Sequence, residues 1–252
     1  MTNQSSPESG RLEKILSGLD NFKPIATRRA FMQKLLLAGG TAAVGAASLG
    51  KVANVFASPD PVTAFGNAAV GAEKIAVAFY SNALGETSAF GVAADLAKGT
   101  LLNDAHRRYF TAARNQEANH LATLESLGLS FGAKTFAFPV GTFASAPSML
   151  AMGESLENIF IGAYLGAIAV AAAAANTFIA EAAAEICGVE CAHRVLIRDI
   201  AGEDPPNDRF YEGDAGVPGV SGDLGNTGTR SHVYASAAEA VNALLGLGIT
   251  AS

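Results

Sequence analysis

This chain of 252 residues contains two pairs of residues of types that bind metals. The two members of each pair are about one helical turn apart. Each pair is a glutamate followed three residues later by a histidine: Glu117 with His120, and Glu190 with His193. Residues i and i+3 share one face of an α-helix, so each pair presents a carboxylate and an imidazole to one point. Two such pairs, with one glutamate from each of two further helices, form the ligand set of a two-metal site inside a four-helix bundle.

Two other glutamates suit the remaining positions of such a site. Glu73 lies in the middle of an apolar surface of small residues, and Glu157 precedes a long uncharged run. A charged residue in an apolar helix must face solvent, be paired or bind a metal. We therefore expect Glu73 and Glu157 to complete the set.

Hard oxygen donors combined with imidazole suit iron or manganese. The spacing predicts two such ions about 3.5–4 Å apart, bridged by Glu117 and Glu190. Each ion would also have one terminal carboxylate and one histidine, and four carboxylates would neutralise two divalent ions. Because both metals change between divalent and trivalent states, the expected chemistry involves O₂ or peroxide.

Hydrophobic periodicity predicts the helices that must position these residues. They are expected at about 61–84, 103–127, 148–170 and 176–200. Residues 128–147 are more than a helix hairpin needs, so we expect this connection to cross the bundle and pack its phenylalanines over one end. The expected fold class is all-α: a four-helix bundle with a long crossover loop, a C-terminal irregular segment and a short closing helix at 236–245.

The two halves of the predicted bundle repeat one another. Tyr80 follows Glu73 by seven residues, and Tyr164 follows Glu157 by the same interval. Seven residues make nearly two helical turns, so each tyrosine lies close to the face of its glutamate. The tyrosines are expected to be hydrogen-bond partners of the ligands, electron donors or ordinary packing residues.

The N-terminal residues 1–57 differ in charge from the rest of the chain. They carry seven Lys/Arg and three Asp/Glu, whereas residues 58–252 carry ten and twenty. An acidic body argues against nucleic acid or an anionic membrane as partner. The pattern Thr27-Arg28-Arg29-Ala30-Phe31, followed by a weakly hydrophobic run and ending at Ala57, resembles a twin-arginine export signal. The resemblance implies export to the periplasm or cell surface after folding, with the metals already bound.

Two features leave alternatives open. Cys187 and Cys191 lie four residues apart on one predicted helix, and are interpreted as small core residues, with a metal or redox role as the alternative. The uncharged run between Glu157 and Glu181 is long enough for a membrane span. Its alanine and glycine content favours a buried pair of bundle helices, and we expect no stable span in the mature chain.

The stretch from about residue 62 to 200 resembles the ferritin-like superfamily. The first half carries Gly71-Ala72-Glu73, Phe79-Tyr80 and Glu117-x-x-His120. The phrase Leu156-Glu157-Asn158, followed by Gly162-Ala163-Tyr164-Leu165-Gly166-Ala167, is similar to exported ferritin-like proteins called desiccation-related. The resemblance implies a four-helix bundle with a di-iron or di-manganese centre. With two histidines, the predicted ligand set is closer to rubrerythrin-type sites, but the chain has no four-cysteine rubredoxin module.

The expected organisation is a signal peptide at 1–57, a ferritin-like bundle at 58–202 and a tail rich in Gly, Pro and Asp at 203–252. One hypothesis for function is a stress-protective di-metal oxidoreductase acting on Fe(II) or peroxide, including catalase-like chemistry. The other is a structural or desiccation-protective envelope protein in which the metal only stabilises the bundle or the site is empty. The sequence is compatible with a homodimer and does not distinguish it from a cage.

Overall fold

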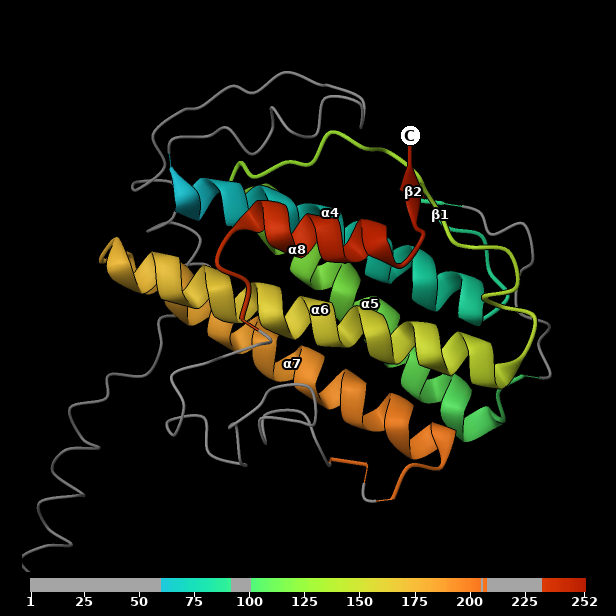
Figure 1. Cartoon of the computed structure of the whole chain (residues 1–252). Helices are drawn as coiled ribbons and strands as arrows, with labels where there is room; N and C mark the ends of the chain where they lie inside the picture. Colours follow the sequence, from blue (N-terminus) through green and yellow to red (C-terminus); the bar gives the residue numbers. More distant parts are fainter. Residues whose placement is uncertain (1–59, 92–100, 205, 208–232) are drawn as a thin grey trace, which may run out of the picture. The chain divides into compact units, whose positions relative to one another are not determined.

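The computed structural model describes residues 60–91, 101–204, 206–207 and 233–252. The predicted export signal lies outside these residues, as does most of the segment rich in Gly, Pro and Asp. Figure 1 shows the arrangement of the described helices and strands. The prediction of an all-α fold built on a four-helix bundle is confirmed.

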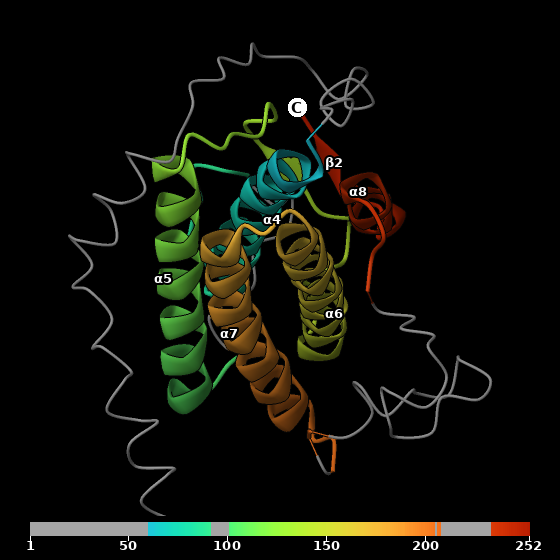
Figure 2. The same cartoon turned by 90° about the vertical axis from the view of Figure 1, so that its left-hand side faces the viewer.

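Four long helices form the bundle: α4 (Pro61–Ala83), α5 (Asp104–Ser126), α6 (Ala146–Ala173) and α7 (Thr177–Ala201). Helix α4 packs against α5 and α6, and α7 also packs against both α5 and α6. Each helix therefore has two neighbours around a common interior, and Figure 2 shows the four helices side by side. Side chains that point inward from all four helices consequently meet at the centre.

Local sequence signals set the helix ends. Asp60 accepts hydrogen bonds from the first backbone amides of α4, and Asn103 and Asn176 do the same for α5 and α7. Ser145 forms a reciprocal capping box with Ser148 at the start of α6. Such caps satisfy amides that have no partner within the helix. The helix bounds consequently lie within three residues of those expected from the periodicity.

The connection from α5 to α6 runs along the bundle from one end to the other, as predicted (Figure 1). Its Phe138 and Phe143 are buried and pack against Phe79 of α4, with ring centroids 6.0 and 5.8 Å from that of Phe79. The same connection contains β1 (Phe136–Ala137), which pairs antiparallel with β2 (Thr250–Ala251) near the C-terminus. This strand pair was not expected from the sequence.

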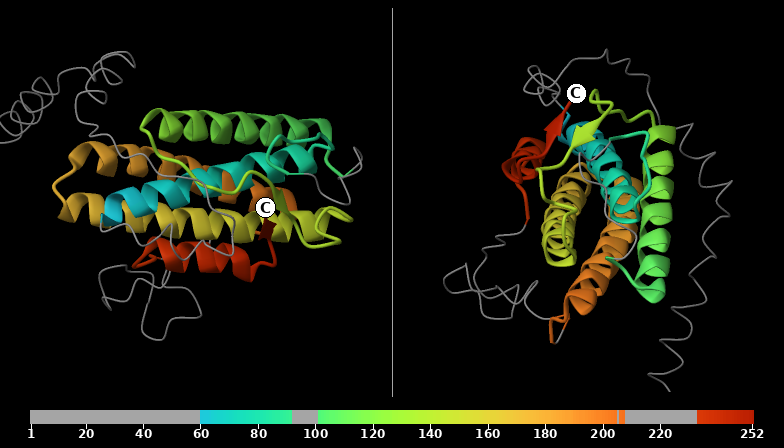
Figure 3. Two further views of the ribbon diagram at one scale, coloured as in Figure 1. Left: turned by 90° about the horizontal axis from the view of Figure 1, so that it is seen from above. Right: turned by 90° about the vertical axis from the view of Figure 1, so that its right-hand side faces the viewer.

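A fifth described helix, α8 (Ala237–Gly246), lies outside the bundle ring and packs on both α4 and α6. It corresponds to the closing helix expected at 236–245. Figure 3 shows α8 beside α6 and the strand pair next to it. Its own apolar residues Ala240, Val241 and Leu244 are buried, so α8 covers the contact between α4 and α6.

Helix α6 is long and apolar enough to cross a membrane by length and composition. Half of its most apolar stretch is buried within the protein (50%). A core helix of a water-soluble protein has the same properties. In this structure α6 also carries Glu157 and Tyr164 on its buried face.

Candidate metal centre

All six residues predicted as metal ligands point into the centre of the bundle. They come from all four helices: Glu73 from α4, Glu117 and His120 from α5, Glu157 from α6, and Glu190 and His193 from α7. The four carboxylates are at most 2% exposed. Burial of four carboxylates together, without compensation, would be strongly unfavourable.

The six residues form two overlapping groups of potential ligands. The first consists of Glu73, Glu117, His120 and Glu190, and the second of Glu117, Glu157, Glu190 and His193. Within each group, one ligand atom from every residue lies within 4.8 Å of the others. Glu117 and Glu190 belong to both groups, as expected of the two residues predicted to bridge the metals.

His120 directs its Nδ1 atom toward three carboxylates. This atom lies 3.0 Å from Glu117 Oε2, 3.4 Å from Glu190 Oε1 and 3.5 Å from Glu73 Oε2. Burial alone would lower the pKa of His120, but its hydrogen bonds to these carboxylates outweigh that effect and raise the pKa to about 12. Without metal, a protonated imidazole therefore balances part of the carboxylate charge.

His193 has the same arrangement in the second group. Its Nδ1 lies 2.8 Å from Glu117 Oε1, 3.3 Å from Glu190 Oε2 and 3.8 Å from Glu157 Oε1. Burial would lower its pKa, but a hydrogen bond to Glu190 and the charge of Glu157 raise it. Both histidines thus present the same ring nitrogen to the cluster.

Gln116 contacts the other side of the His193 ring, and no sequence pattern marks this residue. Nε2 of His193 donates a hydrogen bond to Oε1 of Gln116 at 2.8 Å. Such a bond fixes the tautomer and leaves Nδ1 to bind a metal when it is deprotonated. The internal repeat offered no signal, because the residue before Glu190 is Val189.

Each tyrosine binds the glutamate of the opposite half. Tyr80 on α4 donates to Glu157 Oε1 on α6, and Tyr164 on α6 donates to Glu73 Oε1 on α4. Burial and the charge of the bonded glutamate raise the pKa of both hydroxyls well above 10.0. Both hydroxyls therefore remain protonated and act as hydrogen-bond donors to the predicted terminal ligands.

In the metal-free protein the cluster carboxylates have different pKa values: those of Glu117 and Glu157 are raised, and that of Glu190 is lowered. Burial and the neighbouring Glu190 raise the pKa of both Glu117 and Glu157 well above 4.5. Burial also acts to raise the pKa of Glu190, but hydrogen bonds to His120 and His193 outweigh it and lower the pKa to about 2. Metal binding must therefore displace protons from several groups.

Each carboxylate in the cluster has one buried oxygen without a hydrogen bond in the described part of the chain. These oxygens are Glu73 Oε2, Glu117 Oε1, Glu157 Oε2 and Glu190 Oε1. Charge interactions with the imidazoles remain, since His193 Nδ1 is close to Glu117 Oε1. Buried polar atoms usually have partners, and metal ions would supply them here. The donor set therefore suits a pair of metal ions.

A second polar network joins α6 and α7 beside the cluster. Arg194, the residue after His193, is buried and donates from Nε to Asn158 Oδ1 at 2.7 Å. Arg198 Nη1 lies 2.6 Å from Glu154 Oε1, one turn later on α7 and one turn earlier on α6. These bonds stabilise the contact between the helices that carry Glu157 and His193.

The two cysteines do not belong to either group of potential ligands. Cys187 is buried, its Sγ lies 4.0 Å from the carbonyl oxygen of Ile161, and Cys191 is half-buried on the same helix. Both belong to or pack against an apolar cluster that draws residues from all four bundle helices and includes Ile161. Their surroundings fit the interpretation as small core residues.

Residues 63–203 match the family model described as a ferritin-like domain. The match covers more than half of the chain and includes all six clustered residues and both tyrosines. No curated protein and no solved structure matches the chain significantly.

Proposed function

Because the chain belongs to the family of ferritin-like domain proteins, we propose that it binds two iron or manganese ions and carries out redox chemistry. The observation that carries this proposal is the pair of overlapping ligand groups that share Glu117 and Glu190. Four carboxylates neutralise two divalent ions, and this offsets the cost of burying them together. Iron or manganese at such a site supplies electron transfer to O₂ or peroxide, or oxidation of Fe(II).

The residues of the chain have distinct roles in this proposal. Glu73 and Glu157 would each hold one ion, and the hydroxyls of Tyr164 and Tyr80 hold these two carboxylates in place. The imidazoles of His120 and His193 would each lose the proton on Nδ1, and this nitrogen would hold a metal ion instead. The apolar residues around the cluster exclude bulk water, which strengthens every electrostatic interaction inside.

Exposure differs between the two ends of the site and indicates where solutes enter. The His120 side chain is 12% exposed, whereas His193 is 2% exposed and is additionally held by Gln116. Polar reactants and exchanging protons therefore reach the cluster most readily at His120. We assign the more accessible ion to the group formed by Glu73 and His120.

The proposed role is protection of the cell envelope against oxidative or desiccation stress. The motif around Arg28 and Arg29 supports export by the twin-arginine route, which carries folded proteins. Replacing both arginines with lysine should leave the protein in the cytoplasm, as measured by cell fractionation. Equal amounts of wild type and this variant in the periplasm would contradict the export proposal.

Metal analysis of the wild-type protein tests the central proposal. Full-length protein purified from the cytoplasm should contain about two iron or manganese ions per chain, identified by their X-ray absorption edges. Metal-loaded protein should then either oxidise Fe(II) with O₂ or break down hydrogen peroxide. A chain that binds no metal would overturn the proposal, whereas bound metals without turnover would assign a structural role to the site.

A further inference from the structure

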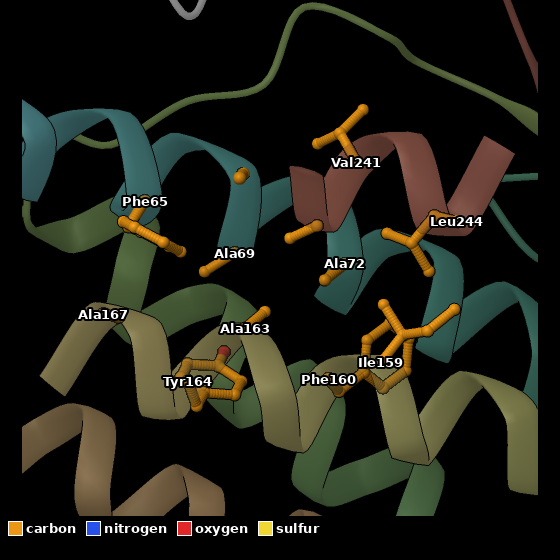
Figure 4. Close-up of a pocket in the computed structure, with 12 residues that line it drawn as sticks. Phe65, Ala69, Ala72, Ile159, Phe160, Ala163, Tyr164, Ala167, Val241 and Leu244 are labelled. Atoms are coloured by element: carbon orange, nitrogen blue, oxygen red, sulfur yellow. The ribbon is translucent and has the colours of Figure 1, made fainter. Parts of the chain in front are cut away.

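A small cavity lies between α4, α6 and α8 (Figure 4). Its volume is about 20 Å³. Helix α4 contributes Phe65 and Ala72, α6 contributes Ala163 and Tyr164, and α8 covers the cavity with residues that include Val241. Nothing in the proposed metal chemistry described above uses this space.

The cavity offers no free hydrogen-bonding side chain. Of the lining residues only Tyr164 carries a polar side-chain group, and its hydroxyl donates to Glu73. A water molecule needs two to four polar partners, and apolar cavities of this kind remain dry. Hydrogen peroxide has the same need, and burying it without partners would cost free energy. The lining therefore selects an apolar guest.

The size of the cavity limits that guest to a very small molecule. About 10–15 Å³, measured as the space open to the centre of a water-sized sphere, suffices for one water molecule. The volume of about 20 Å³ consequently fits a diatomic gas but not an organic substrate. Among the reactants considered for this protein, dioxygen alone is both small and apolar.

The position of Tyr164 connects the cavity with the metal ligands. One side of this buried residue lines the cavity, while its hydroxyl reaches Glu73, a member of the first ligand group. Tyr164 thus contacts both the cavity and a residue of the cluster. Rotation or displacement of that ring would open the path.

A second apolar cavity of about 20 Å³ adjoins the first. It shares Ala68, Ala72, Val241 and Leu244 with the first and continues to Leu245 and to Ile249 beyond the end of α8. Leu245 is 39% exposed. The two cavities share these lining side chains, so apolar residues line the region from Leu245 and Ile249 to Tyr164.

We propose that the cavity beneath α8 binds dioxygen and delivers it to the metal centre past Tyr164. The binding site itself depends only on the packing of α4, α6 and α8, but its use in a reaction rests on the proposed function. It identifies dioxygen, rather than peroxide, as the reactant that arrives by this route. Peroxide would reach the cluster at the more exposed His120.

Nuclear magnetic resonance on metal-free full-length protein under dioxygen pressure tests the binding site directly. Dioxygen is paramagnetic, so it should enhance relaxation of the Ile159, Val241 and Leu244 methyl groups severalfold over that of Ile197. Ile197 is also buried (2% exposed) but does not line the cavity. Equal enhancement at all of these methyl groups would overturn the proposal.

Two variants of α6 provide a matched comparison. Ala163→Leu fills the cavity and should abolish the selective enhancement at Val241 and Leu244. Ala169→Leu makes the same change at an exposed position of the helix and should leave it unchanged. If Ala163→Leu does not fold, Leu244→Ala enlarges the cavity and should increase the enhancement at Ile159. An effect of Ala169→Leu equal to that of Ala163→Leu would overturn the proposal.

Reaction rates of the iron-loaded protein test the delivery step separately. Ala163→Leu should slow Fe(II) oxidation by dioxygen severalfold and leave oxidation by hydrogen peroxide unchanged. Equal slowing with both oxidants would overturn delivery by this route. If wild type oxidises Fe(II) with neither oxidant, the proposed redox function fails, while the metal-free relaxation measurement still decides whether the cavity binds dioxygen.

Discussion

Tyr164 on α6 donates its hydroxyl hydrogen to Glu73 on α4, a residue 91 positions earlier in the chain. Tyr80 on α4 makes the corresponding bond to Glu157 on α6, 77 positions later. The two contacts cross between the halves of the bundle, so each half holds a glutamate of the other. The geometry of both terminal carboxylates therefore depends on the packing of α4 against α6.

Removing either tyrosine hydroxyl should weaken metal binding without unfolding the bundle. We expect Tyr80→Phe and Tyr164→Phe to lower metal affinity about 10–100-fold, because partners of ligands orient them and tune their basicity. Competition with a chelator of known affinity measures this change. The control is Tyr109→Phe on α5, where the tyrosine is 46% exposed. Unchanged affinity in both buried variants would show that the two bonds do not position the ligands.

Substitution of the shared glutamates should have a larger effect than substitution of the terminal ones. Glu117→Gln and Glu190→Gln remove a carboxylate from both ligand groups, so metal content should fall from about two ions per chain to near zero. Glu73→Gln and Glu157→Gln should each retain about one ion. Elemental analysis of the purified variants measures the content.

The exposed Glu185 on α7 provides the matched control for Glu190. Glu185→Gln should bind as much metal as wild type, since this side chain belongs to neither group of ligands. If Glu117→Gln and Glu73→Gln lost the same amount of metal, the assignment of bridging and terminal positions would be wrong.

The metal-free protein should become less stable as pH rises from about 5 to 9. The pKa values of Glu117, Glu157 and His120 are raised in the folded state, His120 from 6.5 to about 12. The folded state therefore retains protons that the unfolded state loses above about 4.5 at the glutamates and above about 6.5 at the histidine. The stabilisation is complete below these unfolded values and is lost as pH rises toward the folded ones. Each group contributes a slope on the order of 1 kcal/mol per pH unit.

Urea unfolding of chelator-treated protein at several pH values measures this slope. Glu190 contributes to the pH dependence of stability with the opposite sign, because its pKa is lowered to about 2. Its stabilising contribution is complete above about 4.5 and is lost as pH falls below that value. Metal-loaded protein should instead gain stability with rising pH, because metal ions compete with protons for the same atoms. Greater stability of the metal-free protein at pH 9 than at pH 6 would contradict this prediction.

Docking of α8 should depend on the absence of a side chain at Gly166 of α6. A Cβ atom there would lie 2.4 Å from the carbonyl oxygen of Tyr234 and 2.8 Å from the Phe65 ring. We expect Gly166→Ala to destabilise the protein by about 1–3 kcal/mol, the usual range for overpacking. Thermal and urea unfolding measure the change.

Gly188 on α7 supplies the matched control, because a Cβ atom there would meet nothing within 4 Å. Gly188→Ala should stabilise the protein by about 0.5–1 kcal/mol through the lower entropy of the unfolded chain. A similar change in stability in both variants would show that the segment around Tyr234 is not held tightly against α6.

The sequence alone determined the helices of the bundle and selected the six clustered residues. Helical periodicity and capping residues such as Asp60 and Ser145 are local signals, so the bounds of α4 to α7 followed from them closely. Glu117 and His120 lie within one helical turn, as do Glu190 and His193, so each pair could be placed on one helix face from the sequence. The repetition of the pattern in both halves identified Glu73 and Glu157.

Only the tertiary structure decided which residues from different helices touch. Gln116 reaches His193 across α5 and α7, and no repeat in the sequence marks it. The pairing of Phe136 with Ala251 joins two short segments whose residues carry no strand pattern of their own. The crossed bonds from Tyr164 to Glu73 and from Tyr80 to Glu157, and the cavity beneath α8, likewise arise from packing over long separations. Local periodicity specifies the face of a helix, but which partner meets that face depends on how the whole chain packs.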